Sequence, residues 1–252
     1  MAGTKKAKKR LDTIVVERNL AESRHRARSL IMAGSILVND TPVDKPGAIV
    51  ENNADIKSRA DDFKYVSRGG LKLEHALDFF GIDVKGSRCL DVGASTGGFT
   101  DCLLQHGADF VCAVDVGYGQ LAWKLRQDSR IKVIERTNIR YMTVADFPCL
   151  FDVITIDVSF ISLEIVVPVV RQLLTPSGRI LALVKPQFEV GKNQVGKGGV
   201  VRDTALHDAV IQKLEDFFYK NCSLTVTGIT QSPVLGPKGN KEFIMLLEYV
   251  YG

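Results

Sequence analysis

The stretch LDVGASTGGFTDCLL, residues 90–104, begins as an apolar run, turns through glycines and resumes with apolar residues at helical spacing. This pattern predicts a strand, a tight turn through Gly93, Gly97 and Gly98, and a helix. In open α/β sheets, ligands bind beyond the carboxyl ends of the strands, where such turns lie. The stretch therefore predicts a ligand-binding loop in an α/β domain.

From residue 67 onward the chain alternates between strand and helix patterns, which indicates a parallel sheet with helices on both faces. Strands are expected at 88–93, 110–116, 132–135, 151–159 and 179–185, and helices near 98–106, 119–126, 163–174 and 204–220. Two last strands, 224–230 and 242–250, are joined by a turn rich in glycine and proline and should form an antiparallel hairpin. This predicted α/β architecture resembles that of class I (Rossmann-like) methyltransferases.

Residues from about 10 to 60 have a different pattern, typical of a small α+β unit. Two short helices are expected at 11–20 and 23–34, a hairpin at 35–50 and one more strand at 53–58. Ser23 is the expected N-cap of the second helix, and Gly34 its expected end. Asn39, Asp40 and Pro42 are the expected turn residues of the hairpin.

The positive charge is concentrated in the first part of the chain. Residues 1–72 contain 15 Lys and Arg against 9 Asp and Glu, whereas the whole chain of 252 residues has a net charge of +4. A basic segment on a near-neutral body is typical of a contact with nucleic acid. The run KKAKKR at 5–10 is equally consistent with a solvated tail.

Composition argues against several other classes of protein. The five cysteines are scattered and never spaced C-x-x-C, so they indicate reduced core thiols. No apolar segment follows the basic N-terminus, and no stretch reaches the length of an uncharged membrane helix. No cluster of His, Cys and Asp has the spacing of metal ligands, so no metal is expected.

The stretch RLDTIVVERNLAESRHRARSLIMAGSILVND, residues 10–40, resembles an S4 domain, the RNA-binding module of ribosomal protein S4 and several RNA enzymes. The resemblance rests on Ser23-Arg24 and on the residues from Gly34 to Asn39. It implies RNA binding. The basic residues expected to contact RNA are Lys9, Arg10, Arg24, Arg26, Arg28, Lys64 and Arg68.

The glycine turn does not match a phosphate-binding loop. From Gly93 the sequence reads G-A-S-T-G-G, which lacks the second glycine of the dinucleotide motif G-x-G-x-x-G, and no P-loop is present. Such a turn suits S-adenosylmethionine (SAM), with Asp91 as a partner for its ammonium group and Asp115 for its ribose hydroxyls. An acid like Asp115 would serve NAD equally well.

Seven further motifs resemble the TlyA family of bacterial rRNA 2′-O-methyltransferases, in which an S4 domain is fused to an FtsJ-like domain and which are often named hemolysins. The motifs are VSRGGLKL, LDVGASTGGFTD, VDVGYGQLAWKLR, ERTN, DVSFISL, VKPQFEVGK and GNKEF. The resemblance implies an S4 domain with a basic tail at 1–60, a linker at 61–67 and a methyltransferase domain at 68–252. It further implies SAM as cofactor, ribosomal RNA in ribosomal subunits as partner, a cytidine ribose as methyl acceptor, and a cytoplasmic location.

The same resemblance implies which residues bind SAM. They are Asp91, Gly93, Ser95, Gly97, Gly98, Phe99, Asp115, Asn138, Asp157 and Phe160. Asn138 departs from the wider FtsJ group, which often has Asp there, so its contact with adenine is less secure.

FtsJ-type enzymes use a Lys-Asp-Lys-Glu set, which corresponds here to Lys72, Asp157, Lys185 and Glu242. Asp157 and Lys185 each follow an apolar run at the end of a strand, where a charge is unusual. A ribose hydroxyl becomes a good nucleophile only as it loses its proton, and a lysine can take that proton only when neutral. Burial and a second ammonium nearby favour the neutral form. We therefore expect Lys185 to be the general base, Lys72 the second cation, and the two acids to position the lysines.

Other methyl acceptors fit the sequence less well. An exocyclic-amine methylase would have a proline-rich turn after the fourth strand, where this chain has DVSF. A cytosine-C5 methylase needs a cysteine at the carboxyl end of the sheet, whereas Cys149 precedes its strand. The basic, glycine-rich segment FEVGKNQVGKGGVVRD is expected to be a lid that contacts RNA or else a plain connection.

Three other functions are considered. An RNA-binding assembly factor with an inactive methyltransferase fold is disfavoured by the intact Lys-Asp-Lys-Glu set. A membrane-active hemolysin is disfavoured by the lack of a signal or spanning segment. A pseudouridine synthase shares the S4 domain, but its catalytic Asp motif has no counterpart after residue 67.

Overall fold

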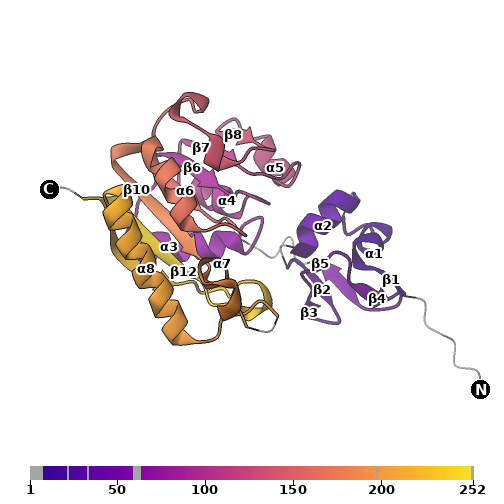
Figure 1. The fold of residues 1–252 in the computed structure, drawn as a ribbon. Helices are drawn as coiled ribbons and strands as arrows, with labels where there is room; N and C mark the ends of the chain where they lie inside the picture. Colours follow the sequence, from indigo (N-terminus) through magenta and orange to yellow (C-terminus); the bar gives the residue numbers. More distant parts are fainter. Residues whose placement is uncertain (1–7, 22, 33, 59–63, 197, 251–252) are drawn as a thin grey trace, which may run out of the picture. The chain divides into compact units, whose positions relative to one another are not determined.

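The computed structural model describes residues 8–21, 23–32, 34–58, 64–196 and 198–250. The chain divides into two compact units, Met1–Arg68 and Gly69–Gly252 (Figure 1). Each unit has its own apolar core among the described residues. Residues 5–7 of the predicted basic tail and 61–63 of the predicted linker lie outside the described residues.

The first unit combines two helices with short antiparallel strands. Its elements are β1 (Lys8–Arg10), α1 (Leu11–Glu17), α2 (Arg24–Met32), β2 (Ile36–Val38), β3 (Thr41–Pro42), β4 (Ile49–Glu51) and β5 (Ile56–Ser58). The strand order is β3-β2-β5 in one sheet, and β1 pairs with β4 in the other. Leu11, Ile14, Ile31 and Ile36 are almost completely buried, so the apolar faces of both helices close one core.

The predicted hairpin is correct in its turn but not in its length. Asn39 and Asp40 both have positive φ, 50° and 59°, as a two-residue hairpin turn requires. The second strand of this hairpin ends at Pro42, and Ile49–Glu51 pairs with Lys8–Arg10 instead. Proline has no N–H to donate to a further ladder bond, which is consistent with the early end of β3.

The second unit is a seven-stranded sheet between layers of helices. Its strands are β6 (Arg88–Val92), β7 (Phe110–Val114), β8 (Ile131–Ile134), β9 (Phe151–Ile156), β10 (Leu174–Val184), β11 (Leu224–Gln231) and β12 (Phe243–Tyr249). Its α-helices are α3 (Gly69–Phe80), α4 (Gly98–Gln105), α5 (Trp123–Arg126), α6 (Leu163–Val170), α7 (Pro186–Glu189) and α8 (Thr204–Cys222). Five 3₁₀ turns connect them: η2 (Ile139–Tyr141), η3 (Val144–Asp146), η4 (Arg171–Leu173), η5 (Lys192–Gln194) and η6 (Pro237–Gly239).

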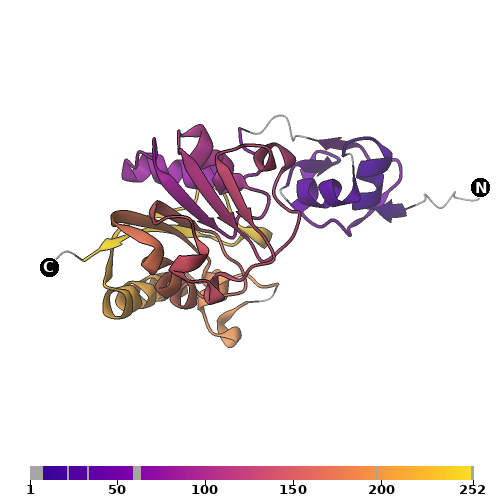
Figure 2. The same cartoon turned by 90° about the horizontal axis from the view of Figure 1, so that it is seen from above.

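The strand order is β11-β12-β10-β9-β6-β7-β8, with the five strands from β10 to β8 parallel and β12 antiparallel to both its neighbours. Helices α3 and α4 lie on one face of the sheet, and α6 and α8 on the other (Figures 1 and 2). This is the predicted doubly wound, Rossmann-like α/β architecture with an antiparallel hairpin at one end. The fold prediction is confirmed.

Local sequence explains where two of the helices begin. The Ser162 side chain accepts a hydrogen bond from the N–H of Glu164 and caps α6, while Asp203 caps α8 through the N–H of Ala205. The predicted helix at 119–126 is shorter than expected, because α5 comprises only Trp123–Arg126. Gly117 and Gly119 precede it in an extended turn, which is consistent with the low helix propensity of glycine.

The topology collects the predicted site residues at one edge of the sheet. The loops after β6, β7, β8, β9 and β10 lie at this edge because the five strands are parallel. The antiparallel strand β12 starts where β10 ends, since Phe243 pairs with Val184. Residues as distant in sequence as Asp157, Lys185 and Glu242 are thereby brought to the same edge.

Candidate active site

The four predicted catalytic residues form two ion pairs. Lys72 Nζ of α3 lies 2.6 Å from Glu242 Oε2, and Lys185 Nζ lies 2.5 Å from Asp157 Oδ1. Lys72, Lys185 and Glu242 are 9%, 8% and 1% exposed. Charges so far from water need partners, and here each lysine has an acid. The structure thus brings the predicted set together.

Asp157 is influenced by both lysines. Burial raises the pKa of its carboxyl, but the charges of Lys185 and Lys72 and the hydrogen bond from Lys185 outweigh burial and hold the pKa below its usual value. Asp157 is therefore an anion at neutral pH, close to two cations.

Ser159 is a neighbour of Lys185 that sequence reasoning missed. Its hydroxyl accepts a hydrogen bond of 3.0 Å from Lys185 Nζ, so the ammonium is held from two sides. The loop carrying Asp157 and Ser159 is tied to α7, because the hydroxyl of Ser162 donates to Glu189 Oε2 at 2.6 Å. Ser159 lies in the motif DVSFISL, but the motif alone does not indicate that its hydroxyl contacts Lys185.

The glycine loop after β6 is built as predicted. Gly93 and Gly97 have φ of +85° and +93°, which strongly favours glycine. A Cβ on Gly93 would lie 2.4 Å from the carbonyl oxygen of Asp157, so this glycine also lets the loop approach the end of β9. The loop and the acid of the ion pair are therefore in direct contact.

Asp91 is completely buried beneath this loop. Its Oδ2 accepts from the N–H and the hydroxyl of Thr100 at 3.0 and 2.7 Å, and its Oδ1 from the hydroxyl of Thr155 at 3.1 Å. Burial raises its pKa to about 7, against the effect of these hydrogen bonds. A cofactor ammonium would have to replace one of the threonines, so the predicted direct contact of Asp91 stays a prediction.

Asp115, after β7, orders two loops. Its Oδ2 accepts from the N–H of Ser95 at 2.8 Å, and its Oδ1 from that of Gly117 at 2.6 Å. At the start of α4, the N–H of Asp101 bonds to Gly97 and that of Thr100 to Asp91. The N–H groups of Gly98 and Phe99 are left, among the described residues, without an acceptor. Two adjacent free N–H groups suit a carboxylate.

The remaining predicted cofactor residues differ in exposure. Phe99 is 5% exposed, so only its backbone can reach a ligand, whereas Phe160 is 91% exposed and has a φ of +64°. Asn138 Oδ1 accepts from the N–H and Nε of Arg140 at 3.1 and 3.3 Å. This leaves the Nδ2 of Asn138 as the group that could contact adenine.

The glycine-rich segment after Lys185 is tied to the turn before β12. The buried Asn240 accepts from the N–H of Val201 at 3.1 Å and donates to the carbonyl of Gly199 at 3.0 Å, and Lys238 Nζ donates to the carbonyl of Gly198. Asn240, which sequence reasoning missed, thus links this segment to the strand that follows Glu242. Lys197 lies outside the described residues.

The basic residues predicted to contact RNA differ in how far their charge is compensated. Lys9 pairs with Glu17 at 2.9 Å, and Arg10 and Arg24 both pair with the buried Asp12, at 2.8 and 3.3 Å. The hydrogen bond from Arg10 lowers the pKa of Asp12 to about 2, although burial of the carboxyl acts in the opposite direction. Lys64 lies over the ring of Tyr65, and Arg68 next to Gly34. Within the described part of the chain, Arg26 and Arg28 have no carboxylate partner.

Two kinds of feature are absent from the described residues. They contain no group of three or more His, Cys, Asp or Glu that could hold a metal ion. They also contain no helix with the length and apolar character that a membrane span requires.

Two family models match the chain: the S4 domain at residues 9–56 and the FtsJ-like methyltransferase at 65–249. YqxC of Bacillus subtilis is 49% identical over 243 residues, which cover 96% of this chain and 86% of that protein. The 16S/23S rRNA (cytidine-2'-O)-methyltransferase TlyA of Mycobacterium tuberculosis is 44% identical over 243 residues, which cover 94% of this chain and 89% of that protein. A solved structure from Streptococcus thermophilus is 42% identical, with a TM-score of 0.76 over 97% of this chain and 90% of the other.

Proposed function

The chain belongs to the FtsJ-like methyltransferase family and, with its S4 domain, to the TlyA family, and on this premise we propose that it transfers a methyl group from SAM to a ribose 2′-hydroxyl of ribosomal RNA. The observation that carries the proposal is the meeting of Lys72, Asp157, Lys185 and Glu242 at the carboxyl edge of the sheet. The name of the relative from Mycobacterium tuberculosis supports a cytidine as acceptor.

The residues of the glycine loop fit SAM. The free N–H groups of Gly98 and Phe99 would receive its carboxylate, and Asp115 its ribose hydroxyls. The adenine would lie beside Asn138. The sulfonium would lie near the anionic Asp157, which contacts the loop through Gly93. Asp91 would support the loop from beneath.

When bound, SAM supplies an electrophilic methyl group on a positively charged sulfur. The chain supplies the base, Lys185, which must be neutral before it can take the proton of the 2′-hydroxyl. Its ion pair with Asp157 holds Nζ in a fixed position at the carboxyl edge of the sheet. Asp157, whose pKa is held below its usual value, would carry the negative charge that faces a positively charged cofactor. In its neutral form, Lys185 would accept the proton of the 2′-hydroxyl on Nζ.

Lys72 and Glu242 would orient the nucleotide rather than move the proton. The pair is buried and held at 2.6 Å, so its charges have fixed positions. Lys72 also acts electrostatically on Asp157, which connects the two pairs. The rest of the rate acceleration would come from aligning oxygen, methyl and sulfur.

The first unit would deliver the RNA. We assign RNA binding to the S4 domain, with Arg26 and Arg28 as its least compensated arginines, and methyl transfer to the second unit. The predicted domain limits 1–60 and 68–252 are part of this proposal, as is action on ribosomal subunits in the cytoplasm.

The test is methylation of ribosomal subunits by the purified full-length protein. Subunits from a strain that lacks the gene are incubated with protein and SAM, and 2′-O-methyl groups are mapped by resistance to alkaline hydrolysis. We expect at least one protected cytidine. Lys185→Ala should lose at least about 1,000-fold in turnover while still binding SAM, because the base contributes to the reaction itself. SAM binding without methylation by the wild type would instead support an inactive assembly factor.

A further inference from the structure

A pair of exposed tyrosines lies at the carboxyl ends of β7 and β8, where the proposed chemistry assigns them no role. Tyr118 and Tyr141 are 64% and 77% exposed. Each lies under an arginine: the Cζ of Arg136 is 4.0 Å from the ring centre of Tyr118, and that of Arg140 is 5.2 Å from the ring centre of Tyr141. These four residues are called the arginine–tyrosine rim.

A cavity of about 430 Å³ opens beside Arg136 and Tyr141, two of the four residues of this rim. Tyr141 and Arg136 line it together with the apolar side chains of Ile134 and Met142 and with Asn138, the residue that the proposed function places beside adenine. Its volume is in the range of small-ligand sites, and it offers an aromatic face, apolar contacts and a cation. A nucleobase has the flat shape that such a lining fits.

The arginines of the rim keep their charge available. Neither Arg136 nor Arg140 forms an ion pair with a carboxylate of the described residues, whereas the nearby Arg126 pairs with Glu135. The one acid that lines the cavity, Asp146, accepts from the N–H and hydroxyl of Thr143 at 2.7 and 3.0 Å. The rim is therefore positive and suited to phosphate.

The backbone holds Arg136 in a conformation that is unfavourable for a residue with a side chain. Its φ is +55°, in the left-handed region that non-glycine residues rarely adopt. The N–H of Arg136 bonds to the carbonyl of Gly117 at 2.9 Å, and that of Thr137 to Asp115 at 3.1 Å. Strained backbone that the surroundings maintain is typical of ligand sites.

We propose that the arginine–tyrosine rim binds an unstacked base of the substrate RNA that flanks the methylated nucleotide, with the base on Tyr141 and the phosphates at Arg136 and Arg140. This inference rests on the proposed function, which makes RNA the substrate. Aromatic rings and arginine planes are the surfaces on which proteins stack single-stranded bases. β8, the strand that precedes Arg136 and Arg140, is three strands from β9, or about 14 Å across the sheet, which leaves room for a neighbouring nucleotide.

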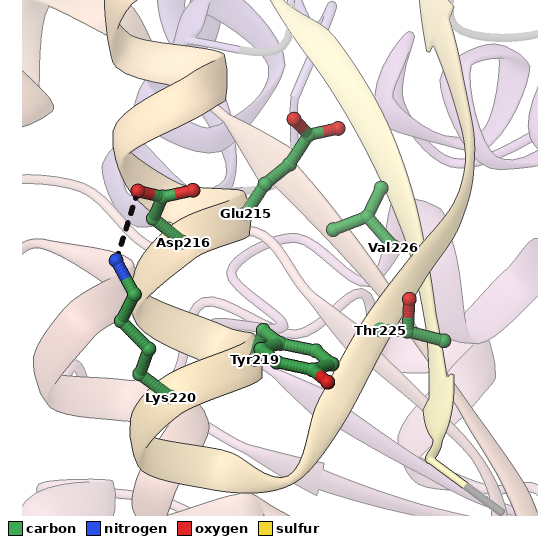
Figure 3. Close-up of a pocket in the computed structure, with 6 residues that line it drawn as sticks. All are labelled: Glu215, Asp216, Tyr219, Lys220, Thr225 and Val226. Carbon is green, nitrogen blue, oxygen red and sulfur yellow. Dashed lines mark hydrogen bonds and ion pairs between the residues drawn. The ribbon is translucent and has the colours of Figure 1, made fainter.

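A second cavity, of about 310 Å³, provides the contrast. It lies between α8 and β11 and is lined by Glu215, Asp216, Tyr219, Lys220, Thr225 and Val226 (Figure 3). Tyr219 is 61% exposed, much like Tyr141. Here the cation, Lys220, is paired with Asp216 at 3.1 Å, and Glu215 adds a second negative charge. The negative charge beside Tyr219 disfavours the approach of phosphate. Tyr219 is therefore a control for Tyr141, with similar exposure but without the available arginines.

The experiment compares Tyr141→Ala with Tyr219→Ala in the full-length protein. Initial rates are measured over a range of concentrations of ribosomal subunits from a strain without the gene, and SAM affinity by calorimetry. We expect Tyr141→Ala to raise the KM for subunits roughly 5- to 100-fold, the effect of losing one stacked base, with SAM affinity within about 2-fold of the wild type. Tyr141→Phe, which keeps the ring, and Tyr219→Ala should match the wild type.

Arg140→Lys separates stacking from charge. Lysine keeps the positive charge but lacks the planar group, so we expect an intermediate rise in KM. An unchanged KM in Tyr141→Ala would overturn the proposal. So would a loss of SAM affinity with an unchanged KM for RNA, which would assign the cavity to the cofactor. If the wild type binds subunits but does not methylate them, the proposed function fails, and the binding affinity of Tyr141→Ala then decides the inference by itself.

Discussion

At the scale of single residues, the site consists of buried charges that neutralise one another. Lys72 with Glu242 and Lys185 with Asp157 have equal numbers of positive and negative groups, so the resting site has little net charge. Removing one member of a buried pair leaves its partner uncompensated, which is costly. Neutral neighbours such as Ser159 are therefore better probes of how the site works.

Ser159→Ala should lower kcat about 10-fold and leave both KM values unchanged. The hydroxyl accepts a hydrogen bond from Lys185 Nζ at 3.0 Å without carrying a charge itself, and losing one such hydrogen bond has an effect of this order. Steady-state kinetics on ribosomal subunits checks the expectation. Ser159→Thr keeps the hydroxyl and should restore kcat to within about 2-fold. Equal kcat in the alanine variant and the wild type would show that Ser159 does not position Lys185.

Asp91 should make stability depend on pH. Its pKa is about 7 in the folded protein, against 3.8 as the ordinary value. Between these values the folded state binds more protons than the unfolded state. The stabilising effect is complete below pH 3.8 and is lost as pH rises towards 7, so the free energy of unfolding should fall by about 4 kcal/mol.

Asp91→Asn tests this dependence, because its amide stays neutral at every pH. Urea denaturation at several pH values, followed by the fluorescence of Trp123, the single tryptophan of the chain, reports on the second unit. The variant should show a smaller fall than the wild type between pH 4 and 8. Parallel curves for the two proteins would exclude Asp91 as the titrating group.

At the scale of elements, the residues at strand ends were predictable from the sequence. The pairing of side chains that are far apart in the sequence was not. Apolar runs that stop at a charge indicated Asp157 and Lys185, and the glycines at 93 and 97 indicated the turn. The pairing of Lys72 with Glu242 spans 170 residues, and no local pattern connects them; it was expected only from the family resemblance. Ser159 lies in the motif DVSFISL and Asn240 in the motif GNKEF, but neither motif indicates their roles, which depend on contacts made in the folded state.

Asn240→Ala should loosen the glycine-rich segment without unfolding the sheet. The side chain is 3% exposed and bonds to Val201, Gly199 and Pro237, and leaving such buried groups without partners costs about 1–3 kcal/mol. We expect the amides of residues 198–203 to exchange hydrogen roughly 10- to 100-fold faster, as measured by mass spectrometry. Asn193→Ala, at an exposed position in the same segment, is the control. Unchanged exchange in Asn240→Ala would contradict the expected role.

At the scale of the whole molecule, charge and chemistry are divided between the two units. The S4 domain carries much of the excess positive charge, whereas the second unit contains the paired charges of the site. Affinity for nucleic acid that comes from phosphate contacts weakens as salt displaces them. The contribution of each unit can therefore be separated by salt.

Deleting residues 1–60 should weaken binding to ribosomal RNA and reduce its salt dependence, while SAM affinity stays within about 2-fold. The slope of log K against log salt is negative, and its magnitude decreases by roughly one unit for each phosphate that the protein no longer neutralises. Filter binding at several salt concentrations measures the slope, and calorimetry with SAM verifies that the second unit is folded. A slope equal to that of the full-length protein would count against the S4 domain as the main RNA-binding unit.

The position of β12 has a consequence for the order of events during synthesis. Glu242 follows Lys72 by 170 residues and reaches the site only when β12 has paired with β10. A nascent chain on the ribosome can complete its first unit early, since domains generally fold as units from the N-terminus. It acquires Glu242, the fourth member of the proposed site, only once the last strand has been translated and inserted. Each molecule can thus recognise RNA before it can alkylate it.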